Sequence, residues 1–343
     1  MKLLVTGVAG FIGYHLAKRL AKENHDIVCI DNINNYYDID LKYDRLASLG
    51  FVCDALTNTG GDDPFISSIF PNLCFIKIDL CDTGRVANLF SRNAFDIVLH
   101  MAAQAGVRYS ITNPHAYISG NIQGFLNLLE SARTHPTRHL VYASSSSVYG
   151  LNTKTPFSEN DAVNRPASLY AATKRSGELM AHAYSHLYHI PTTGLRFFTV
   201  YGPWGRPDMS PFIFAKSIIE GKPINVYNNG KMKRDYTYID DIVEGIIRVM
   251  DVIPKEKTAE NTASAAIYNI GNGRPVELMD FIHTLEEALG KKAIIQYAPM
   301  QQGDVIKTWA DCSRLEHDTG FRPYTELSVG IKEFVEWYRN YYH

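Results

Sequence analysis

Short apolar runs alternate with longer amphipathic segments along the first part of the chain. The runs are continuously apolar, which is typical of strands that are covered on both faces in a parallel sheet. The segments between them carry helical periodicity. Strands are expected at residues 2–5, 26–30, 74–78, 96–100, 139–143 and 193–198, and helices at 13–21, 86–90, 122–132 and 168–188. This repeated βαβ pattern predicts an α/β fold with a doubly wound parallel sheet.

The regular pattern weakens after Tyr201, in the proline- and glycine-rich segment GPWGRPDMSP. Such a composition is typical of a loop, and we expect a second, smaller lobe to begin here. The first domain is predicted to span residues 1–198, with part of 235–250, and a substrate-binding α/β lobe to span residues 199–343. Within that lobe we expect a helix at 211–220, a strand at 225–227, a surface loop at 252–265 and a helix at 328–338.

Composition and charge argue against several classes of partner. The formal charge of the 343 residues is −2, with acidic and basic residues interspersed, so no broad cationic surface for nucleic acid is predicted. The five cysteines are scattered and lack C-x-x-C spacing, which argues against a disulfide framework and against a bound metal such as zinc. No apolar run approaches the ~18 residues of a membrane span, and the glycine-interrupted start is unlike a signal peptide. We therefore expect a cytoplasmic protein without a membrane partner.

A glycine-rich turn lies between the first predicted strand and the first predicted helix, where Gly7, Gly10 and Gly13 give the spacing G-x-x-G-x-x-G. Glycines at this junction permit a tight turn, let the backbone approach a pyrophosphate, and bring helix and strand close together. Asp31 follows the second predicted strand, about where a carboxylate would accept the ribose hydroxyls of NAD and repel the 2′-phosphate of NADP. These residues could be purely structural, but their order along the chain favours a Rossmann-type domain that binds NAD.

Tyr170 and Lys174 lie four residues apart in a predicted helix, so their side chains project from one face of it. Use of a tyrosine as a base near neutrality requires its pKa to fall by about 3 units from about 10, which corresponds to about 4 kcal/mol. An exposed ion pair contributes at most ~1 kcal/mol, so Lys174 must act in a partly desolvated pocket, beside an oxidised nicotinamide. The serine run of YASSSSVYG follows the preceding strand at the sheet edge where open α/β folds bind ligands, so it can place a serine beside the phenol. Either residue alone is more often a packing or surface residue, but their joint placement after this serine favours catalysis.

Several sequence strings, in the same order and over nearly the whole chain, resemble the extended short-chain dehydrogenase/reductase family. They are TGVAGFIG, LHMAAQAG, YASSSSVYG, YAATK, RFFTVYGP and RDYTYIDD. Within that family, AAQAGVRYS and TVYGPWGRPDM are similar to the NAD-dependent nucleotide-sugar epimerases that act on UDP-glucuronate. The resemblance implies a tightly bound NAD, a UDP-sugar substrate, and a homodimer formed by the helices near 122–132 and 168–188.

The resemblance also implies roles for residues at matching positions. The catalytic set is Tyr170, Lys174 and Ser145; the tyrosine and the lysine also contact the cofactor, and the tyrosine and the serine also contact the substrate. Besides the glycines and Asp31, the implied cofactor contacts are Phe11, Ile12, Asn32, Asp79, Leu80, Ala102, Ala103 and Gln104. The implied contacts to the nucleotide of the substrate are Asn225, Val226, Tyr227, Arg234 and Asp304.

The expected reaction begins when ionised Tyr170 removes the proton of the C4 hydroxyl while hydride leaves C4 for NAD. The 4-keto sugar then turns its other face, and hydride returns with inversion. In a glucuronate the ketone lies β to the carboxylate, so the site must hold that carboxylate against loss of carbon dioxide. Candidate partners of the carboxylate are Ser145, Ser146, Ser147, Thr199, Arg108 and Arg206. Strand-end hydrogen bonding for the hydroxyls and simple solvation for Arg206 are the structural alternatives.

Other reactions remain alternatives at this stage. Dehydratases and decarboxylases that act on nucleotide sugars tend to carry acidic residues directly after the strand-end hydroxyl, whereas this chain has Ser146 and Ser147 there. A UDP-glucose or UDP-N-acetylhexosamine 4-epimerase is the closest competitor, because a hydroxyl-rich pocket also suits a neutral sugar. A dehydrogenase that releases NADH, and a noncatalytic protein that senses a dinucleotide, are the remaining alternatives.

Overall fold

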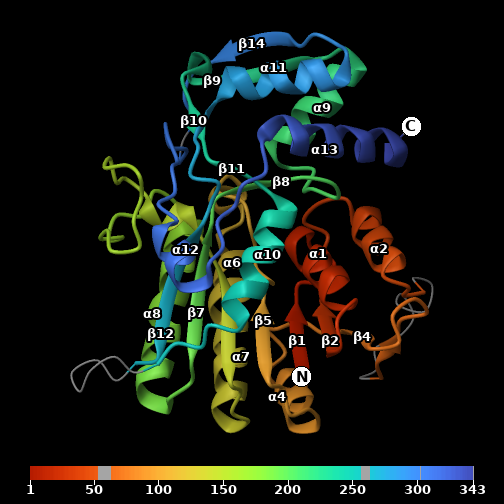
Figure 1. The fold of residues 1–343 in the computed structure, drawn as a ribbon, viewed down its shortest axis with the longest axis vertical. Helices are drawn as coiled ribbons and strands as arrows, with labels where there is room; N and C mark the ends of the chain where they lie inside the picture. The colour runs from red at the N-terminus through yellow and green to blue at the C-terminus, as the bar shows by residue number, and fades with distance from the viewer. Residues whose placement is uncertain (53–62, 256–262, 302, 343) are drawn as a thin grey trace.

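An eight-stranded sheet forms the larger part of the molecule, in the lower half of Figure 1. The computed structural model describes residues 1–52, 63–255, 263–301 and 303–342. The strand order is β12-β7-β6-β5-β1-β2-β4-β3, and all neighbours are parallel except β3 and β4. The strands are β1 (Lys2–Thr6), β2 (Asp26–Asp31), β3 (Phe65–Ile66), β4 (Leu73–Lys77), β5 (Ile97–His100), β6 (His139–Ser145), β7 (Thr192–Phe197) and β12 (Ala265–Ile270). The chain winds outward from β1 in both directions, which confirms the doubly wound α/β fold and all the strands predicted for this sheet.

Helices cover both faces of the sheet because its central strands are apolar on both sides. In β1, Leu3 and Val5 pack into one core and Leu4 packs into the other, as the alternation of side chains along a strand requires. The first core contains residues of α1 (Phe11–Leu20), α2 (Ile39–Ser48), α10 (Ile239–Met250) and α12 (Ser313–Thr319). The second contains residues of α4 (Thr83–Arg92), α7 (Gly124–Thr134) and α8 (Leu169–Tyr188), and α7 is preceded by α5 (Tyr109–Thr112), α6 (Pro114–Tyr117) and the π-helix η1 (Ile118–Gln123).

A smaller lobe lies above the carboxyl ends of the strands, at the top of Figure 1. Its helices are α9 (Ser210–Glu220), α11 (Leu278–Leu289) and α13 (Leu327–Tyr342), with the short turn η3 (Asn228–Gly230). The strands that pair outside the large sheet are β8 (Thr199–Tyr201) with β11 (Tyr236–Tyr238), β9 (Pro223–Tyr227) with β14 (Ile294–Ala298), and β10 (Lys233–Arg234) with β13 (Val276–Glu277). The helices predicted at 211–220 and 328–338 and the strand predicted at 225–227 are therefore present.

The chain returns to the large sheet after it has entered the smaller lobe. α10 packs against α1, and β12 pairs in parallel with β7 at the edge of the sheet. β12 therefore belongs to the large sheet, although the sequence-based division at residue 198 places it in the other lobe. Its apolar run AAIYNI is the local signal for this strand. Residues 256–262 of the predicted surface loop lie outside the described residues.

Aromatic packing holds the two lobes together beside the glycine turn. The ring centroid of Trp204, in the loop after β8, lies 5.5 Å from that of Tyr14 in α1 and 5.5 Å from that of Trp337 in α13. The buried core on this face is continuous from the sheet into the smaller lobe. The relative position of the lobes, and hence the shape of the space between them, is therefore set by packed side chains.

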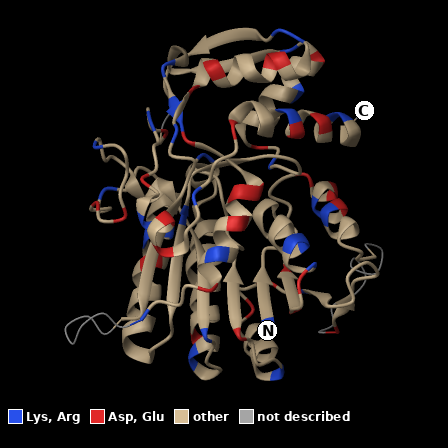
Figure 2. Ribbon diagram, viewed as in Figure 1, with Lys and Arg blue, Asp and Glu red and all other residues tan. Residues whose placement is uncertain are grey.

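Charged residues of both signs are interspersed on the surface, for example along α2 and α13 in Figure 2. Among the residues that the structure describes, no helix is both long and apolar enough to cross a membrane. Cys29, Cys74, Cys81 and Cys312 are free thiols.

Candidate active site

A cleft of about 660 Å³ lies at the carboxyl ends of the strands and takes its walls from both lobes. This volume is in the range of sites that bind small molecules. Most of the predicted site residues line it: Gly7, Gly10, Phe11, Ile12, Gly13, Asp31, Asn32, Asp79, Leu80, Ala102, Ala103, Gln104, Ser145, Ser146, Ser147, Tyr170, Lys174, Thr199, Arg206, Arg234 and Asp304. The structure thus brings the residues proposed for the cofactor and for the sugar into one space, and their individual roles stay predictions.

The glycine turn forms a close-fitting backbone cradle at one end of the cleft. Gly7 has a φ of 77°, and a Cβ on it would lie 2.7 Å from the backbone nitrogen of Ala102. A Cβ on Gly13 would lie 2.1 Å from the carbonyl oxygen of Gly7. Gly10 is the N-cap of α1 and brings no side chain to that helix end. No side chain caps the N–H groups of the first helical turn, and the residues of this turn line the cleft, which fits the pyrophosphate of a dinucleotide.

Asp31 lies where the ribose of the dinucleotide is expected. Its carboxylate accepts hydrogen bonds from the N–H of Ala9 (3.1 Å) and the N–H of Ile33 (2.7 Å). Burial raises the pKa of Asp31, and the nearby ammonium of Lys42 acts in the opposite direction. The Lys42 ammonium is itself held by two oxygens of Asn34, at 2.6 and 2.7 Å. Asp31 is therefore fixed in orientation while it faces the cleft.

The loops that follow β4 and β5 are held by side-chain hydrogen bonds in and beside the cleft. Asn32 Nδ2 donates to Asp79 Oδ2 (3.0 Å), which ties the ends of β2 and β4 together at the expected adenine end. The N–H of Gln104 donates to Asn121 Oδ1 (2.8 Å), and Asn121 Nδ2 donates back to the Gln104 carbonyl (3.0 Å). Asn121 lies in η1 and was not predicted as a site residue, because nothing in its local sequence marks it.

Tyr170 and Lys174 face the cleft from the first turns of α8. Ser168 caps this helix, since its hydroxyl accepts from the N–H of Ala171 (3.1 Å). Lys174 Nζ donates to the carbonyl of Ala143 in β6 (2.8 Å) and lies 6.0 Å from the centroid of the Tyr170 ring. The ammonium is thus held between the sheet and the phenol, which is the arrangement that the predicted proton chemistry needs.

Burial acts against the charged form of both groups. It raises the pKa of Tyr170, while contacts with Ser145 and Arg206 lower it. Burial also lowers the pKa of Lys174 to about 8. In the protein alone the phenol is therefore protonated at neutral pH, and a further positive charge in the cleft is needed to ionise it.

Arg206 lies in the cleft but its charge is already compensated. Its Nε donates to Asp208 Oδ1 (3.0 Å) and its Nη2 to Oδ2 of the same carboxylate. The hydroxyl of Tyr36 also donates to Asp208 (2.9 Å), and the guanidinium lies 5.8 Å from the centroid of the Tyr36 ring. Neither partner was predicted: Asp208 lies two residues further along the same loop, whereas Tyr36 comes from a distant part of the chain and carries no local motif.

Arg234 and Asp304, both predicted to contact the nucleotide, form an ion pair with each other (2.6 Å) at the wall that the smaller lobe provides. The remaining predicted substrate residues do not line the cleft. Val226 is fully buried in the core of the smaller lobe, and Asn225 is exposed. The guanidinium of Arg108 lies 5.4 Å from the centroid of the Tyr227 ring.

A cradle for dinucleotide phosphates, set beside a partly buried tyrosine and a buried lysine on a doubly wound sheet, defines an enzyme of the short-chain dehydrogenase/reductase class. The sequence profile of the NAD dependent epimerase/dehydratase family matches residues 3–271, and the chain belongs to this family. The resemblance and the fold class predicted from the sequence are confirmed.

Individual relatives share the whole length of the chain. It is 46% identical to a probable UDP-glucuronate 4-epimerase of Rhizobium meliloti (strain 1021), with 100% of this chain and 98% of the relative covered. It matches the UDP-glucuronic acid 4-epimerase from Bacillus cereus, solved with UDP-glucuronic acid and NAD, with a TM-score of 0.85, 32% identity and 100% of both chains covered. It matches the UDP-glucose 4-epimerase of Thermotoga maritima, solved with UDP-glucose, with a TM-score of 0.82, 27% identity and 99% of both chains covered.

The Gly13→Ala substitution tests the cradle. The added methyl group would overlap the Gly7 carbonyl, so the turn must move away from α1. We expect a loss of roughly 1–3 kcal/mol in the free energy of unfolding, as for other overpacked sites, and a loss of bound NAD from the purified protein. The matched control is Gly84→Ala in α4, where the nearest atom to the new Cβ lies at 3.6 Å. Equal NAD content and equal stability in the two variants would contradict the cradle.

Proposed function

We propose that this protein inverts C4 of UDP-glucuronate, with NAD as its bound cofactor, and so interconverts UDP-glucuronate and UDP-galacturonate. The observation that carries the proposal is the convergence of Tyr170, Lys174 and Ser145 on the cleft that the glycine turn also lines. Similarity over the whole chain to proteins named UDP-glucuronate 4-epimerase, one of them solved with UDP-glucuronic acid and NAD, supports the choice of substrate.

The residues of this chain then have distinct tasks. When bound, NAD accepts hydride from C4 and returns it, and its oxidised ring adds positive charge to the cleft. Tyr170 removes the proton of the C4 hydroxyl and gives it back after the keto sugar has turned. Lys174 stabilises the phenolate through its ammonium, which the Ala143 carbonyl holds in place. Ser145, at the end of β6, hydrogen-bonds to the phenolic oxygen of Tyr170 and to the C4 oxygen of the sugar.

The nucleotide is proposed to lie against the smaller lobe. Arg234 offers a guanidinium to the diphosphate, and its ion pair with Asp304 fixes the direction of that group. The proposed contacts of residues 225–227 with uracil and of Arg108 with the substrate stay predictions, since these residues do not line the cleft in the structure. The sugar is left with room to rotate between the fixed nucleotide and the fixed cofactor.

The carboxylate of the sugar is proposed to meet the hydroxyls of Ser146, Ser147 and Thr199, which line the cleft near Tyr170. Arg206 contributes as a hydrogen-bond donor, because Asp208 already compensates its charge. Such an arrangement orients the carboxylate without an excess cation. Holding it in the plane of the ketone would disfavour loss of carbon dioxide, since the bond that breaks must align with the carbonyl π-system.

A UDP-glucose 4-epimerase is the second candidate, on the similarity to the Thermotoga maritima enzyme. The hydroxyl-lined cleft would also accept a neutral hexose. The proposed homodimer is supported by large apolar side chains exposed on α8, Leu179 (54%) and Leu187 (60%), and by Ile118 (47%) in η1, directly before α7. A cytoplasmic location belongs to the same proposal.

Incubation with UDP-glucuronate, followed by proton NMR, tests the proposed reaction. We expect an equilibrium mixture with UDP-galacturonate and no accumulation of NADH, because each turnover regenerates the cofactor. UDP-glucose, which lacks the carboxylate, should react at least about tenfold more slowly, as expected when a group that the site hydrogen-bonds is missing. Faster turnover of UDP-glucose would favour the second candidate, and stoichiometric NADH would indicate a dehydrogenase.

The Arg206→Ala and Ser147→Ala variants test the control of the carboxylate. Each removes one hydrogen-bond donor, so a larger fraction of the keto intermediates should lose carbon dioxide and end as a UDP-pentose. Carbon dioxide release and the UDP-pentose yield are measured per turnover. Arg248→Ala is the control, since Arg248 is exposed on α10 and paired with Glu244 (2.6 Å). Product ratios equal to the control would argue against both roles.

The pH dependence of kcat/KM tests the role of Lys174. Its lowered pKa means that the ammonium loses its proton as the pH rises through about 8. Without that charge the phenolate of Tyr170 is less stable, so kcat/KM should fall above pH 8. Lys174→Arg keeps a positive charge at all these pH values, so its decline should move to higher pH even if its overall rate is lower. A wild-type profile that keeps rising to pH 10 would be inconsistent with this role.

A further inference from the structure

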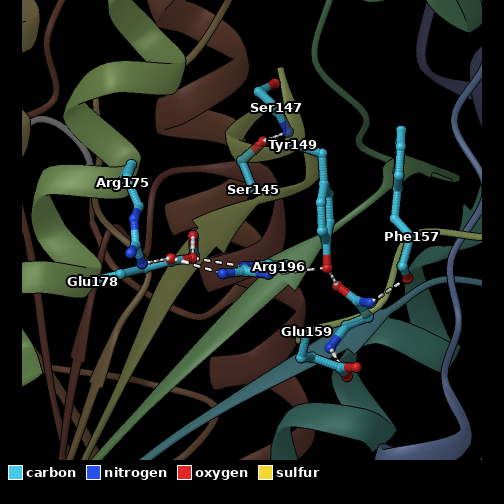
Figure 3. A network of polar contacts seen from close by, with 10 residues as sticks. Ser145, Ser147, Tyr149, Phe157, Glu159, Arg175, Glu178 and Arg196 are labelled. Atoms are coloured by element: carbon cyan, nitrogen blue, oxygen red, sulfur yellow. Dashed lines mark hydrogen bonds and ion pairs between the residues drawn. The ribbon is translucent and has the colours of Figure 1, made fainter. Parts of the chain in front are cut away.

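A chain of buried polar contacts runs behind the serines of the active site, from α8 through β7 to the turn that follows β6 (Figure 3). At its centre, Arg196 of β7 is only 2% exposed. Its Nε donates to Glu178 Oε1 (2.8 Å) and its Nη2 to Glu178 Oε2 (2.9 Å). This two-pronged geometry fixes both the distance and the orientation between α8 and β7.

Glu178 continues the face of α8 that carries the catalytic pair, since Tyr170, Lys174 and Glu178 are spaced by four residues. Three successive residues of β6 contact three successive turns of this face. The pairs are Ala143 with Lys174 (2.8 Å), Ser144 with Glu178 (2.7 Å) and Ser145 with Tyr170. The register between the strand and the helix is therefore defined by the same residues that carry the chemistry.

Tyr149 connects the other side of Arg196 to the end of the serine turn. Its hydroxyl accepts from Arg196 Nη1 (3.0 Å) and donates to Asn269 Oδ1 in β12 (2.6 Å). Asn269 Nδ2 in turn donates to the carbonyls of Phe157 (2.9 Å) and Asp311 (3.1 Å). The ring of Tyr149 stacks on that of Phe157 with centroids 4.5 Å apart. Both the ring and the hydroxyl of Tyr149 are thus fixed.

The short helix η2 (Ser146–Tyr149) is a single turn between these two anchors. Ser144 precedes it and binds Glu178, while Tyr149 ends it and binds Arg196. Within the turn, the N–H of Ser147 donates to Ser145 Oγ (3.2 Å), so the hydroxyl proton of Ser145 is left to point at another acceptor. A shift of either anchor would displace that hydroxyl relative to Tyr170.

We propose that Glu178, Arg196 and Tyr149 are positioning residues that hold the serine turn in register with Tyr170 for the reaction. This inference deepens the proposed function and rests on it. A buried ion pair is a poor way to gain stability, because desolvation of the two charges offsets their attraction. Unlike apolar packing, the ion pair and its hydrogen bonds fix the orientation of the groups that they join. They connect α8, β6, β7 and β12 at one point behind the site.

Tyr149→Phe is the main test, because it removes one oxygen and keeps the stacked ring. We expect kcat to fall about tenfold, as for a small displacement of a reacting group, while KM for the UDP-sugar and the NAD content stay within about twofold. The acid limb of kcat should move to higher pH, because the contact with Ser145 lowers the pKa of Tyr170. A larger share of turnovers should also release carbon dioxide.

Tyr268→Phe is the matched control. Tyr268 neighbours Asn269 in β12, and its hydroxyl donates to a carboxylate on α12, Asp318 (2.8 Å), away from the serine turn. This variant should lose similar stability and keep the wild-type kcat, pH profile and product ratio. If Tyr149→Phe behaves like the control in all three, the positioning role is overturned. Ser144→Ala removes the opposite anchor with a smaller change, and gives the same comparison if Tyr149→Phe does not fold.

A readout without substrate separates this inference from the proposed function. Ionisation of Tyr170 can be followed in the NAD-loaded protein as the difference in tyrosinate absorbance between each variant and the same variant with Tyr170→Phe. Tyr149→Phe should shift this ionisation to higher pH, and Tyr268→Phe should leave it unchanged. This result holds whichever UDP-sugar is turned over, so a failure to epimerise UDP-glucuronate counts against the proposed function alone. Equal ionisation in both variants counts against the positioning role.

Discussion

The burial of the Lys174 ammonium beside the phenol of Tyr170 is the constraint on which the rest of the site depends. Burial disfavours the charged form of each group, so it raises the pKa of the tyrosine and lowers that of the lysine. Neither shift favours a phenolate by itself. In the proposed mechanism the pair becomes a proton acceptor only when the cleft gains further positive charge, which the oxidised cofactor would supply. Binding of NAD and readiness for proton transfer are therefore linked through one electrostatic requirement.

The fold meets this requirement by fixing backbone elements rather than by flexible side chains. Ser168 caps α8 and so defines where the helix begins. The carbonyl of Ala143, near the carboxyl end of β6, holds the ammonium of Lys174. The Glu178–Arg196 pair repeats the link between helix and sheet one turn further along α8. On the other side of the cleft, the packing of Trp204 between Tyr14 and Trp337 fixes the smaller lobe. The rigid parts of the site are thus those proposed to handle protons and phosphates, with the proposed place of the sugar between them.

The features that could be predicted from the sequence are those with a local signal. The strands show as apolar runs, the cradle as glycines at a strand-to-helix junction, and the proposed catalytic pair as a four-residue spacing on a helix. Glu178 continues that spacing, so its place on the same face of α8 as Tyr170 could be predicted. Its pairing with Arg196 could not. The burial of Val226 could also have been predicted, because the apolar residues Ile224 and Val226 alternate with the polar residue Asn225 along β9. Pairings such as Tyr36 with Asp208, or Arg234 with Asp304, depend on which loops the fold brings together. No local pattern contains that information.

The most direct test of the central claim is the ionisation of Tyr170 in the protein with and without NAD. It is followed by tyrosinate absorbance, with the Tyr170→Phe variant subtracted in each state. The account predicts that the phenol of the NAD-free protein ionises at higher pH than an ordinary tyrosine, and that NAD shifts its ionisation to below the ordinary value near 10. An ionisation that does not change when NAD binds would contradict the account.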